Sequence, residues 1–319
     1  MKEYDTPILF LIFNRLGTAQ QVFNQIRSIK PKFLFVAADG PRENIEGESE
    51  KCIETRAILN QIDWNCTLKT LFREKNSGCG LGVSSAITWF FEHVEQGIIL
   101  EDDCFPDLSF FTYCAELLDK YKEDHNIYMI SGTNLQNGIR RGEASYYFSN
   151  YTITWGWASW RRAWRYFNYE INDIEYTFKS GQLDHVFPRN EEKIFWMNKF
   201  KEAILDKKNI WDYQWFYSIW KNKGIGITPN TNLIINIGFL NNGTHTFLRD
   251  SRREPVSINP ILFPLIHPTE NVDIQADIFA YEQAFRHSIS RFFRLLKENG
   301  IFPILNYIFR KIASKKRSL

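Results

Sequence analysis

The stretch from Gly97 to Asp103 reads Gly-Ile-Ile-Leu-Glu-Asp-Asp, and it indicates both the fold and the site. Its three aliphatic residues form a continuous apolar run, as a strand buried on both faces of a sheet requires. The run ends in Glu101, Asp102 and Asp103. Three adjacent carboxylates at the end of a buried strand repel one another unless a cation lies among them. The stretch therefore predicts a strand that ends at a cation site, with a solvated acidic turn as the alternative.

Other apolar runs of the same kind begin near residues 8, 33, 68 and 127, about 25–35 residues apart when the run at 98 is included. This is the size of a strand–helix–strand unit. Helical patterns separate the runs, and the polar residues 43–50 are expected to form a loop. The first half therefore predicts an α/β fold with an open, mostly parallel twisted sheet flanked by helices.

The second half has a different composition, with aromatic residues crowded into residues 146–170. We expect helices near 190–208 and 211–223, strands at 225–229 and 232–237, a loop over 248–275 and a helical tail from residue 281. The chain then divides into three parts. These are a nucleotide-sugar-binding half (1–145), an aromatic-rich acceptor and catalytic half of the same domain (146–275), and a C-terminal tail (276–319).

Composition excludes several classes of protein. The chain has 319 residues, 44% of them hydrophobic and 24% charged, which is typical of a globular protein rather than of a disordered or fibrous chain. A formal net charge of +2 is too balanced for a general nucleic-acid binder. The five cysteines form no CxxC pair, and no apolar run is long enough to span a membrane. We therefore expect a cytoplasmic protein with reduced thiols.

Polar residues follow several of the predicted strands at the point where each strand ends. Asn14 and Arg15 follow the first strand, Asp39 and Gly40 the second, and the segment 76–78 the third. In open α/β sheets the ligand lies outside the carboxyl ends of the strands. Each of these pairs alone is typical of a turn, but together they predict a ligand site at one edge of the sheet.

Glu101 and Asp103 are the expected metal ligands, because alternate residues of a strand share a face. Hard oxygen ligands in a site with open positions suit Mg²⁺ or Mn²⁺ that bridges to ligand phosphates. His245 lies in a loop rich in Gly and Asn and is a further candidate ligand for Mn²⁺. A loop histidine that is simply exposed is the alternative.

The segment from Gly78 to Gly82 reads Gly-Cys-Gly-Leu-Gly and precedes a predicted helix. Its glycines allow a phosphate to approach the backbone, and a tight turn explains them equally well. Val83 occupies the place of the third glycine of a dinucleotide-binding fingerprint, so the segment does not match that motif.

Tryptophans gather in the segment 155–164, which begins Trp-Gly-Trp-Ala-Ser-Trp-Arg-Arg. Core packing is the ordinary role of such residues. The glycine between Trp155 and Trp157 also indicates close approach of a flat ligand such as a sugar, and we expect Trp157 to contact it. Arg161 or Arg162 could balance phosphate charge, unless they lie on a solvated helix face.

Asp212 lies among aromatic residues, in the sequence Trp-Asp-Tyr-Gln-Trp. Such surroundings raise the pKa of a carboxyl group and prepare it to act as a general base. A helix N-cap is the alternative, because Asp is favoured there and a helical pattern begins at this residue.

The order of these motifs resembles that of the bacterial nucleotide-diphospho-sugar transferases, glycosyltransferases of the GT-A fold. The matching elements are Asn-Arg, Ala-Asp-Gly-Pro-Arg, Asn-x-Gly, Glu-Asp-Asp-Cys-x-Pro, Trp-Gly-Trp-Ala-Ser-Trp, Trp-Asp-x-x-Trp, Asn-Ile-Gly-Phe and Thr-His. The chain is also distantly similar to the eukaryotic α-mannoside β-1,2-N-acetylglucosaminyltransferases. The resemblance covers roughly residues 5–250 and leaves out the tail.

The resemblance implies roles for individual residues. Asn14 and Arg15 would lie at the donor nucleotide, and Gly40, Asn76 and Gly78 are further candidates for this site from their place at the strand ends. Asp39 would hydrogen-bond the uracil ring of a UDP-sugar. Asp102 and Asp103 would match the Asp-x-Asp element, with Asp103 at the metal and Asp102 nearer the ribose and sugar. Asp212 would be the catalytic base.

These roles imply an inverting glycosyl transfer. A Mn²⁺ or Mg²⁺ ion acts as a Lewis acid on the leaving diphosphate, and positive charge builds at the anomeric carbon. Asp212 removes the proton of the acceptor hydroxyl, which attacks in line. The acceptor would be a glycan or a lipid-linked saccharide in cell-surface polysaccharide assembly.

The tail from His287 to Leu319 combines basic and apolar side chains. It carries eight Lys or Arg residues and a single acid, Glu298. A basic amphipathic helix suits the anionic inner face of a membrane, so we expect peripheral membrane contact here. A helix packed on the catalytic domain is the alternative.

Three other functions compete with the transferase. A metal-dependent nucleotidyltransferase or phosphohydrolase uses the same acidic strand end but leaves the tryptophans unexplained. A non-catalytic glycan-binding module explains the tryptophans but not Glu101, Asp102 and Asp103, which we call the acidic triplet. An NAD-dependent enzyme is suggested by Asp102, which lies 20 residues after Gly82, but the glycine pattern does not fit.

Overall fold

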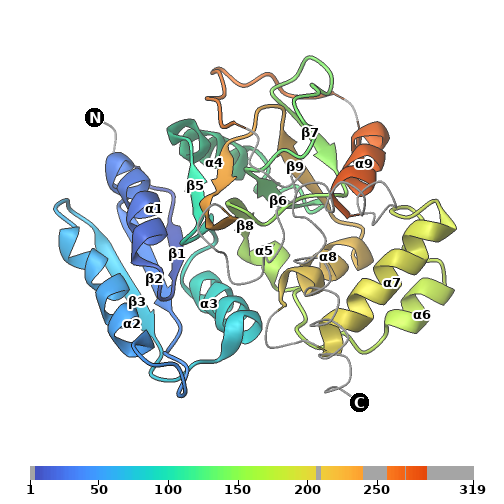
Figure 1. Cartoon of the computed structure of the whole chain (residues 1–319). Coiled ribbons are helices and arrows are strands. Elements are labelled where there is room, and N and C mark those ends of the chain that lie inside the picture. Colours follow the sequence, from blue (N-terminus) through green and yellow to red (C-terminus); the bar gives the residue numbers. More distant parts are fainter. Residues whose placement is uncertain (1–3, 206–209, 240–256, 270, 286–319) are drawn as a thin grey trace, which may run out of the picture.

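The structure is a computed structural model that describes residues 4–205, 210–239, 257–269 and 271–285. A central sheet forms the middle of the molecule and has helices on both of its faces (Figure 1). The described strands are β1 (Ile8–Ile12), β2 (Phe33–Ala38), β3 (Thr67–Phe72), β4 (Gln96–Glu101), β5 (Cys104–Pro106), β6 (Ile127–Ser131), β7 (Tyr146–Ser149), β8 (Trp157–Trp160), β9 (Ile225–Pro229) and β10 (Ile234–Asn236).

The helices alternate with the strands in the first half and cluster together in the second. The described α-helices are α1 (Leu16–Ile29), α2 (Glu48–Arg56), α3 (Gly78–His93), α4 (Leu108–Lys120), α5 (Arg161–Trp164), α6 (Ile174–Lys179), α7 (Asn190–Leu205), α8 (Asp212–Lys221) and α9 (Ile274–Ala280). The short helices η1 (Ala57–Gln61), η2 (Ile237–Phe239) and η3 (Tyr281–Phe285) complete the set.

The large sheet has the strand order β3-β2-β1-β4-β8-β6-β9-β7. Strands β3, β2, β1 and β4 are mutually parallel, and in register Ile8 of β1 lies between Leu34 of β2 and Ile98 of β4. Strand β8 runs antiparallel between β4 and β6, whereas β6 and β9 are parallel. The carboxyl ends of β1, β2, β4, β6 and β9 therefore lie along one edge of the sheet.

Alternate residues of the buried strands face two separate hydrophobic layers, as the period of a strand requires. Ile8 and Phe10 belong to one layer, in which the buried sides of α1 and α4 cover the sheet. Leu9 and Leu11 belong to the other, in which α3 and the tryptophan-rich helices α5, α7 and α8 cover it. Because both faces are covered, the strands are apolar throughout rather than alternating.

A second, two-stranded sheet lies directly after the acidic triplet. In it β10 pairs antiparallel with β5, and Asn236 lies opposite Cys104. The backbone N–H of Ile237 then donates to the backbone oxygen of Asp103 at 2.8 Å. The Asn-Ile-Gly-Phe segment is thereby returned to the acidic triplet from about 130 residues further along the chain.

The expected α/β fold with a mostly parallel sheet and flanking helices is confirmed. Three details were wrong. Residues 43–50 are not all loop, because α2 begins at Glu48. The aromatic segment contains two strands, β7 and β8, and a further strand, β5, follows the acidic triplet. The strand expected over 232–237 is the shorter β10, and it lies outside the large sheet.

The division into halves at residue 145 stays a prediction, although strands from both halves share one sheet. Within the described residues, no helix combines the length and the apolarity that crossing a membrane requires. Most of the tail, residues 286–319, lies outside the described residues, and so does His245.

Candidate active site

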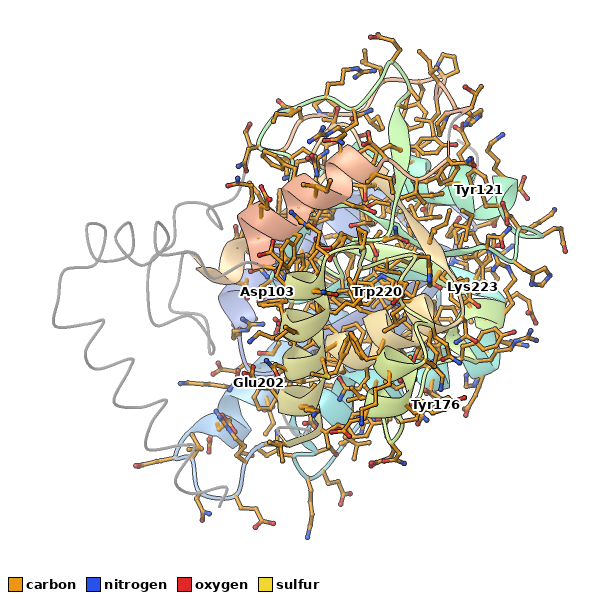
Figure 2. The ribbon with its side chains drawn as sticks, turned by 90° about the vertical axis from the view of Figure 1, so that its right-hand side faces the viewer. Asp103, Tyr121, Tyr176, Glu202, Trp220 and Lys223 are labelled. Atoms are coloured by element: carbon orange, nitrogen blue, oxygen red, sulfur yellow. The ribbon has the colours of Figure 1, made fainter. Side chains whose placement is uncertain are left out.

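The acidic triplet lies at the carboxyl edge of the sheet, where β4 ends. Figure 2 shows Asp103 on one side of the molecule, whereas Tyr121 and Lys223, which lie before β6 and β9, are on the other side. The expected convergence of strand ends is found here, because Arg15 at the end of β1 reaches both aspartates. Its Nη1 donates to Asp103 Oδ2 at 2.8 Å, and its Nη2 bonds to Asp102 Oδ1.

Asp102 is 2% exposed and is held from two sides. Besides the contact with Arg15, its Oδ2 accepts a hydrogen bond from the backbone N–H of Phe13 at 3.2 Å. Burial raises the pKa of Asp102 to about 6 in spite of the neighbouring guanidinium. These bonds give Asp102 the task of fixing Arg15 and the end of β1, and the ribose contact expected for it stays a prediction.

Among the three carboxyl groups of the acidic triplet, Glu101 has the pKa that its neighbours raise most. Burial comes first, followed by the negative charges of Asp103, Asp102 and Asp212, and together they raise the pKa of Glu101 to about 8. Asp212 acts on Glu101 across the site, so the sheet edge and the start of α8 face the same region. A cation bound among these carboxylates would lower the pKa of Glu101 again and displace its proton.

Asp212 is the first residue of α8, yet it does not cap that helix in the usual way. Its Oδ1 accepts a hydrogen bond from the backbone N–H of the next residue, Tyr213, at 3.0 Å, and the N-cap position is occupied by Trp211. Burial raises the pKa of Asp212 to about 6. The side chain therefore has the environment expected of a general base, although its role in catalysis stays a prediction.

The donor set at the triplet can be compared with what a divalent ion needs. Among the described residues, no three His, Cys, Asp or Glu side chains are grouped so that they could hold a metal ion. A site for Mg²⁺ commonly takes one or two carboxylates from the protein and its other ligands from water and phosphates. Glu101 and Asp103 fit such a site, because hard oxygen donors and an excess of negative charge meet there.

A close approach of the backbone explains Gly238 in the Asn-Ile-Gly-Phe segment. A Cβ atom on this residue would lie 2.5 Å from Asp103 Oδ2 and 3.1 Å from Arg15 Nη1. Any side chain here would displace the carboxylate of Asp103 from its present position. The segment is therefore part of the site through its backbone.

Asp39 holds the amino terminus of α3. Its carboxylate accepts hydrogen bonds from the backbone N–H groups of Gly40 and Ser77 at 3.0 Å and of Gly78 at 3.1 Å. The positive end of the helix dipole thus already has an anion bound to it. The glycine-rich start of α3 serves this contact in the structure, and the contacts of Asp39 with uracil and of Gly78 with the donor stay predictions.

Asn76 joins the same network and ties the second strand end to the third. Its Nδ2 donates to the backbone oxygen of Gly40 at 2.9 Å, and its Oδ1 accepts from the N–H of Gly78 at 3.1 Å. The side chain of Arg56 donates to the backbone oxygens of Asp39 and Arg73 at 3.0 Å and 2.8 Å. The turn after β2 is thereby fixed from two sides.

The tryptophans form a core beneath Asp212. Trp157 is fully buried, and its ring packs against those of Trp211, Trp215 and Trp164, with centroids 6.0–6.1 Å away. Its ligand contact stays a prediction that this burial does not favour. The ring instead belongs to the hydrophobic layer that contains Trp211 and Trp215, the tryptophans that flank Asp212 in the sequence.

Gly156 was expected to admit a flat ligand, and the structure gives it another reason. It has a φ of +60°, a conformation that favours glycine. A Cβ on this residue would also lie 2.4 Å from Cδ1 of Ile234 in β10. The space beside Gly156 is occupied by the chain itself, because the side chain of Ile234 packs against this residue.

Arg161 and Arg162 lie at the opposite edge of the sheet from the triplet. Arg161 bonds to the backbone oxygen of Phe91 and pairs with Glu95, just before β4. Arg162 donates to the backbone oxygens of Tyr121, Lys122 and Ile127 at 2.8–2.9 Å. Neither guanidinium is placed to balance phosphate charge at the carboxyl edge, so that expectation was wrong.

Glu48, which is buried beside Asn14 and Arg42, was not among the residues predicted for the site. A signal for it does exist. Glu48, Cys52 and Thr55 are the buried residues of α2 and lie at helical spacing, so an acid occupies the inner face of the helix. An acid on the buried face of a helix is rare without a partner.

No protein-family model matches the chain, and no curated protein matches it. Among solved structures, it is similar to TarS from S. aureus at 12% identity and a TM-score of 0.40, with 72% of this chain and 59% of that chain covered. It is similar to mouse xyloside xylosyltransferase 1 in its apo form at 12% identity and a TM-score of 0.34, with 67% and 81% covered. For 4-diphosphocytidyl-2C-methyl-D-erythritol synthase from Anaerococcus prevotii, the identity is 11% and the TM-score 0.33, with 62% and 99% covered. Similarity at this level carries no argument about function, which must come from the site.

Proposed function

We propose that the protein is a glycosyltransferase that moves a sugar from a nucleotide diphosphate donor to a hydroxyl group of a glycan or glycolipid acceptor. The observation that carries this proposal is the placement of a half-buried Asp212, whose carboxyl group has a pKa of about 6, near the acidic triplet at the carboxyl edge of the sheet. One region thus offers a general base and a set of carboxylates suited to a cation that carries a diphosphate.

Asp212 is the proposed base. A general base works best when its pKa lies near the pH of the reaction, because it must be ionised yet still hold a proton well. With a pKa near 6, Asp212 is mostly ionised at neutral pH and binds a proton more strongly than an exposed aspartate does. It would take the proton of the acceptor hydroxyl as that oxygen attacks the anomeric carbon, which gives inversion.

Asp103 and Glu101 would hold a Mn²⁺ or Mg²⁺ ion, and His245 is a further candidate ligand. When bound, such an ion supplies Lewis acidity to the leaving diphosphate. Arg15 lies next to this position and would add a second positive charge toward the phosphates. Asp102 keeps Arg15 in place through its buried contact.

The donor nucleotide would lie along the ends of β1 and β2, near Asn14, Asp39, Gly40, Asn76 and Gly78. UDP is proposed as the nucleotide, with Asp39 at the uracil ring. The acceptor would approach from the side of α8, where Asp212 begins the helix. A role in cell-surface polysaccharide assembly would use a lipid-linked acceptor at the inner face of a membrane.

Thermal denaturation with a panel of UDP- and GDP-sugars, with and without Mn²⁺, tests the donor. A ligand that binds only the native state raises the melting temperature by mass action. We expect a UDP-sugar to stabilise the protein more with Mn²⁺ than without. If no nucleotide sugar stabilises the protein under either condition, the proposal is wrong.

Asp212→Asn tests the chemistry. The substitution removes the base but keeps the shape, so sugar transfer should fall by about 100-fold or more while the donor affinity stays nearly unchanged. The control is Asp119→Asn, which removes a carboxylate from an exposed pair with Lys122. A variant at Asp212 that retains near-wild-type turnover would exclude this residue as the base. Release of pyrophosphate instead of UDP would indicate a nucleotidyltransferase.

A further inference from the structure

A buried carboxylate holds the two segments that would face the nucleoside of the donor. Glu48 begins α2 and is 1% exposed. Its Oε1 accepts a hydrogen bond from Nδ2 of Asn14, at the end of β1, at 2.9 Å. Its Oε2 accepts from the backbone N–H of Arg42, in the turn after β2, at 2.7 Å.

The guanidinium of Arg42 donates further hydrogen bonds to the carboxylate of Glu48. Its Nε lies 3.0 Å from Oε2, its Nη2 also bonds to Oε1, and its guanidinium lies over the ring of Phe13 with 5.9 Å to the centroid. These bonds hold the pKa of Glu48 below its usual range, so the side chain remains ionised. An ionised carboxylate accepts hydrogen bonds and donates none.

This chemistry decides how the amide of Asn14 is turned. Because the carboxylate of Glu48 can only accept, the amide of Asn14 must point its NH₂ group toward Glu48. Its Oδ1 then points away from Glu48. Asn14 is half-buried and stands between Phe13 and Arg15, next to the acidic site. Its Oδ1 makes no hydrogen bond to the residues that the structure describes, so this acceptor is available to a ligand.

We propose that Glu48 is a positioning residue that fixes the amide of Asn14 so that Oδ1 accepts a hydrogen bond from the nucleoside of the donor. The matching group on the ligand is an N–H of the base or an O–H of the ribose. This inference rests on the proposed function and makes it more specific. A uracil ring offers an N–H at the position where cytosine has only an acceptor nitrogen, so a contact with the base would also select the nucleotide.

The test measures affinities by calorimetry for UDP, CDP and 2′-deoxy-UDP with saturating Mn²⁺. Glu48→Gln keeps the shape, but its side chain can both donate and accept, so Asn14 is free to turn over. We expect the affinity for UDP to fall roughly tenfold, the size of one hydrogen bond. Glu50→Gln removes the same charge from the exposed side of α2 and should leave the affinity unchanged.

The preference among the three nucleotides identifies the group on the ligand. If the wild type prefers UDP to CDP and Glu48→Gln reduces that preference, the contact is with the base. If the preference for UDP over 2′-deoxy-UDP is reduced instead, the contact is with the ribose. If Glu48→Gln changes neither preference, the inference is wrong.

A double-mutant cycle separates positioning from a general structural effect. If Glu48 acts through Asn14, Glu48→Gln should weaken UDP binding in the wild type but have little further effect in Asn14→Ala. Losses that simply add would overturn the inference while leaving the proposed function intact. A wild-type protein that binds none of the three nucleotides would overturn this inference and the choice of UDP, and the proposed function itself would be wrong if GDP-sugars also failed to stabilise the protein.

Discussion

Asp212 shows how a residue's surroundings decide its chemistry. The sequence placed it among aromatic residues and left two interpretations open, a base or a helix N-cap. The structure makes it the first residue of α8, with Trp211 at the N-cap position, and burial raises its pKa to about 6. Local composition predicted the apolar environment, but only the fold could bring Glu101 opposite to it.

We expect kcat/KM to depend on pH through Asp212. A base must be ionised to accept a proton, so the rate should fall about tenfold per pH unit below the pKa of about 6 and level off above it. The measurement is a profile of kcat/KM from pH 4.5 to 8 at saturating Mn²⁺. A flat profile between pH 5 and 7 would contradict the assignment.

Residues whose partners lie far along the chain were the hardest to foresee. Glu48 appeared to be one acid in a polar loop because its partner Asn14 is 34 residues away. Trp157 appeared to be a ligand contact because its partners Trp211 and Trp215 follow more than 50 residues later. The acidic triplet was predictable because all of its carboxylates are adjacent in the chain.

At the scale of single elements, strands with a long apolar run were predicted and short aromatic strands were not. Strand β1 has five buried residues in succession, whereas β8 consists of Trp-Ala-Ser-Trp and lacks β-branched residues. Its two tryptophans favour a strand, but they do not alternate with polar residues, and the Ala and Ser between them give no strand signal. It forms because β4 and β6 offer hydrogen-bonding partners on both of its sides.

The amino terminus of α3 depends on Asp39. Asp39→Ala removes the carboxylate that accepts from the backbone N–H groups of Ser77 and Gly78, and should lower the free energy of unfolding by about 1 kcal/mol. Asp39→Asn keeps an acceptor oxygen and should lose less. Urea denaturation of both variants measures the difference. Equal losses would show that the carboxylate's charge, rather than its acceptor oxygen, stabilises the helix.

At the scale of the whole molecule, the predicted membrane contact of the C-terminal tail can be tested in solution. Residues 286–319 lie outside the described residues, and their basic and apolar composition predicts contact with anionic membranes. The full chain should co-sediment with vesicles that contain anionic lipid, and a chain that ends at residue 285 should not. The binding should weaken as salt is raised. Equal sedimentation of the two proteins would remove this proposal.

The position of β8 has a consequence for the order in which the protein can be made. Its neighbours β4 and β6 leave the ribosome first, but they are joined in the sheet only by β8, which comes later in the chain. Until Trp160 has been synthesised, the inner side of β4 is an unpaired strand edge, which is open to aggregation. A nascent chain that pauses before this residue should therefore require a chaperone, even though its first four parallel strands are complete.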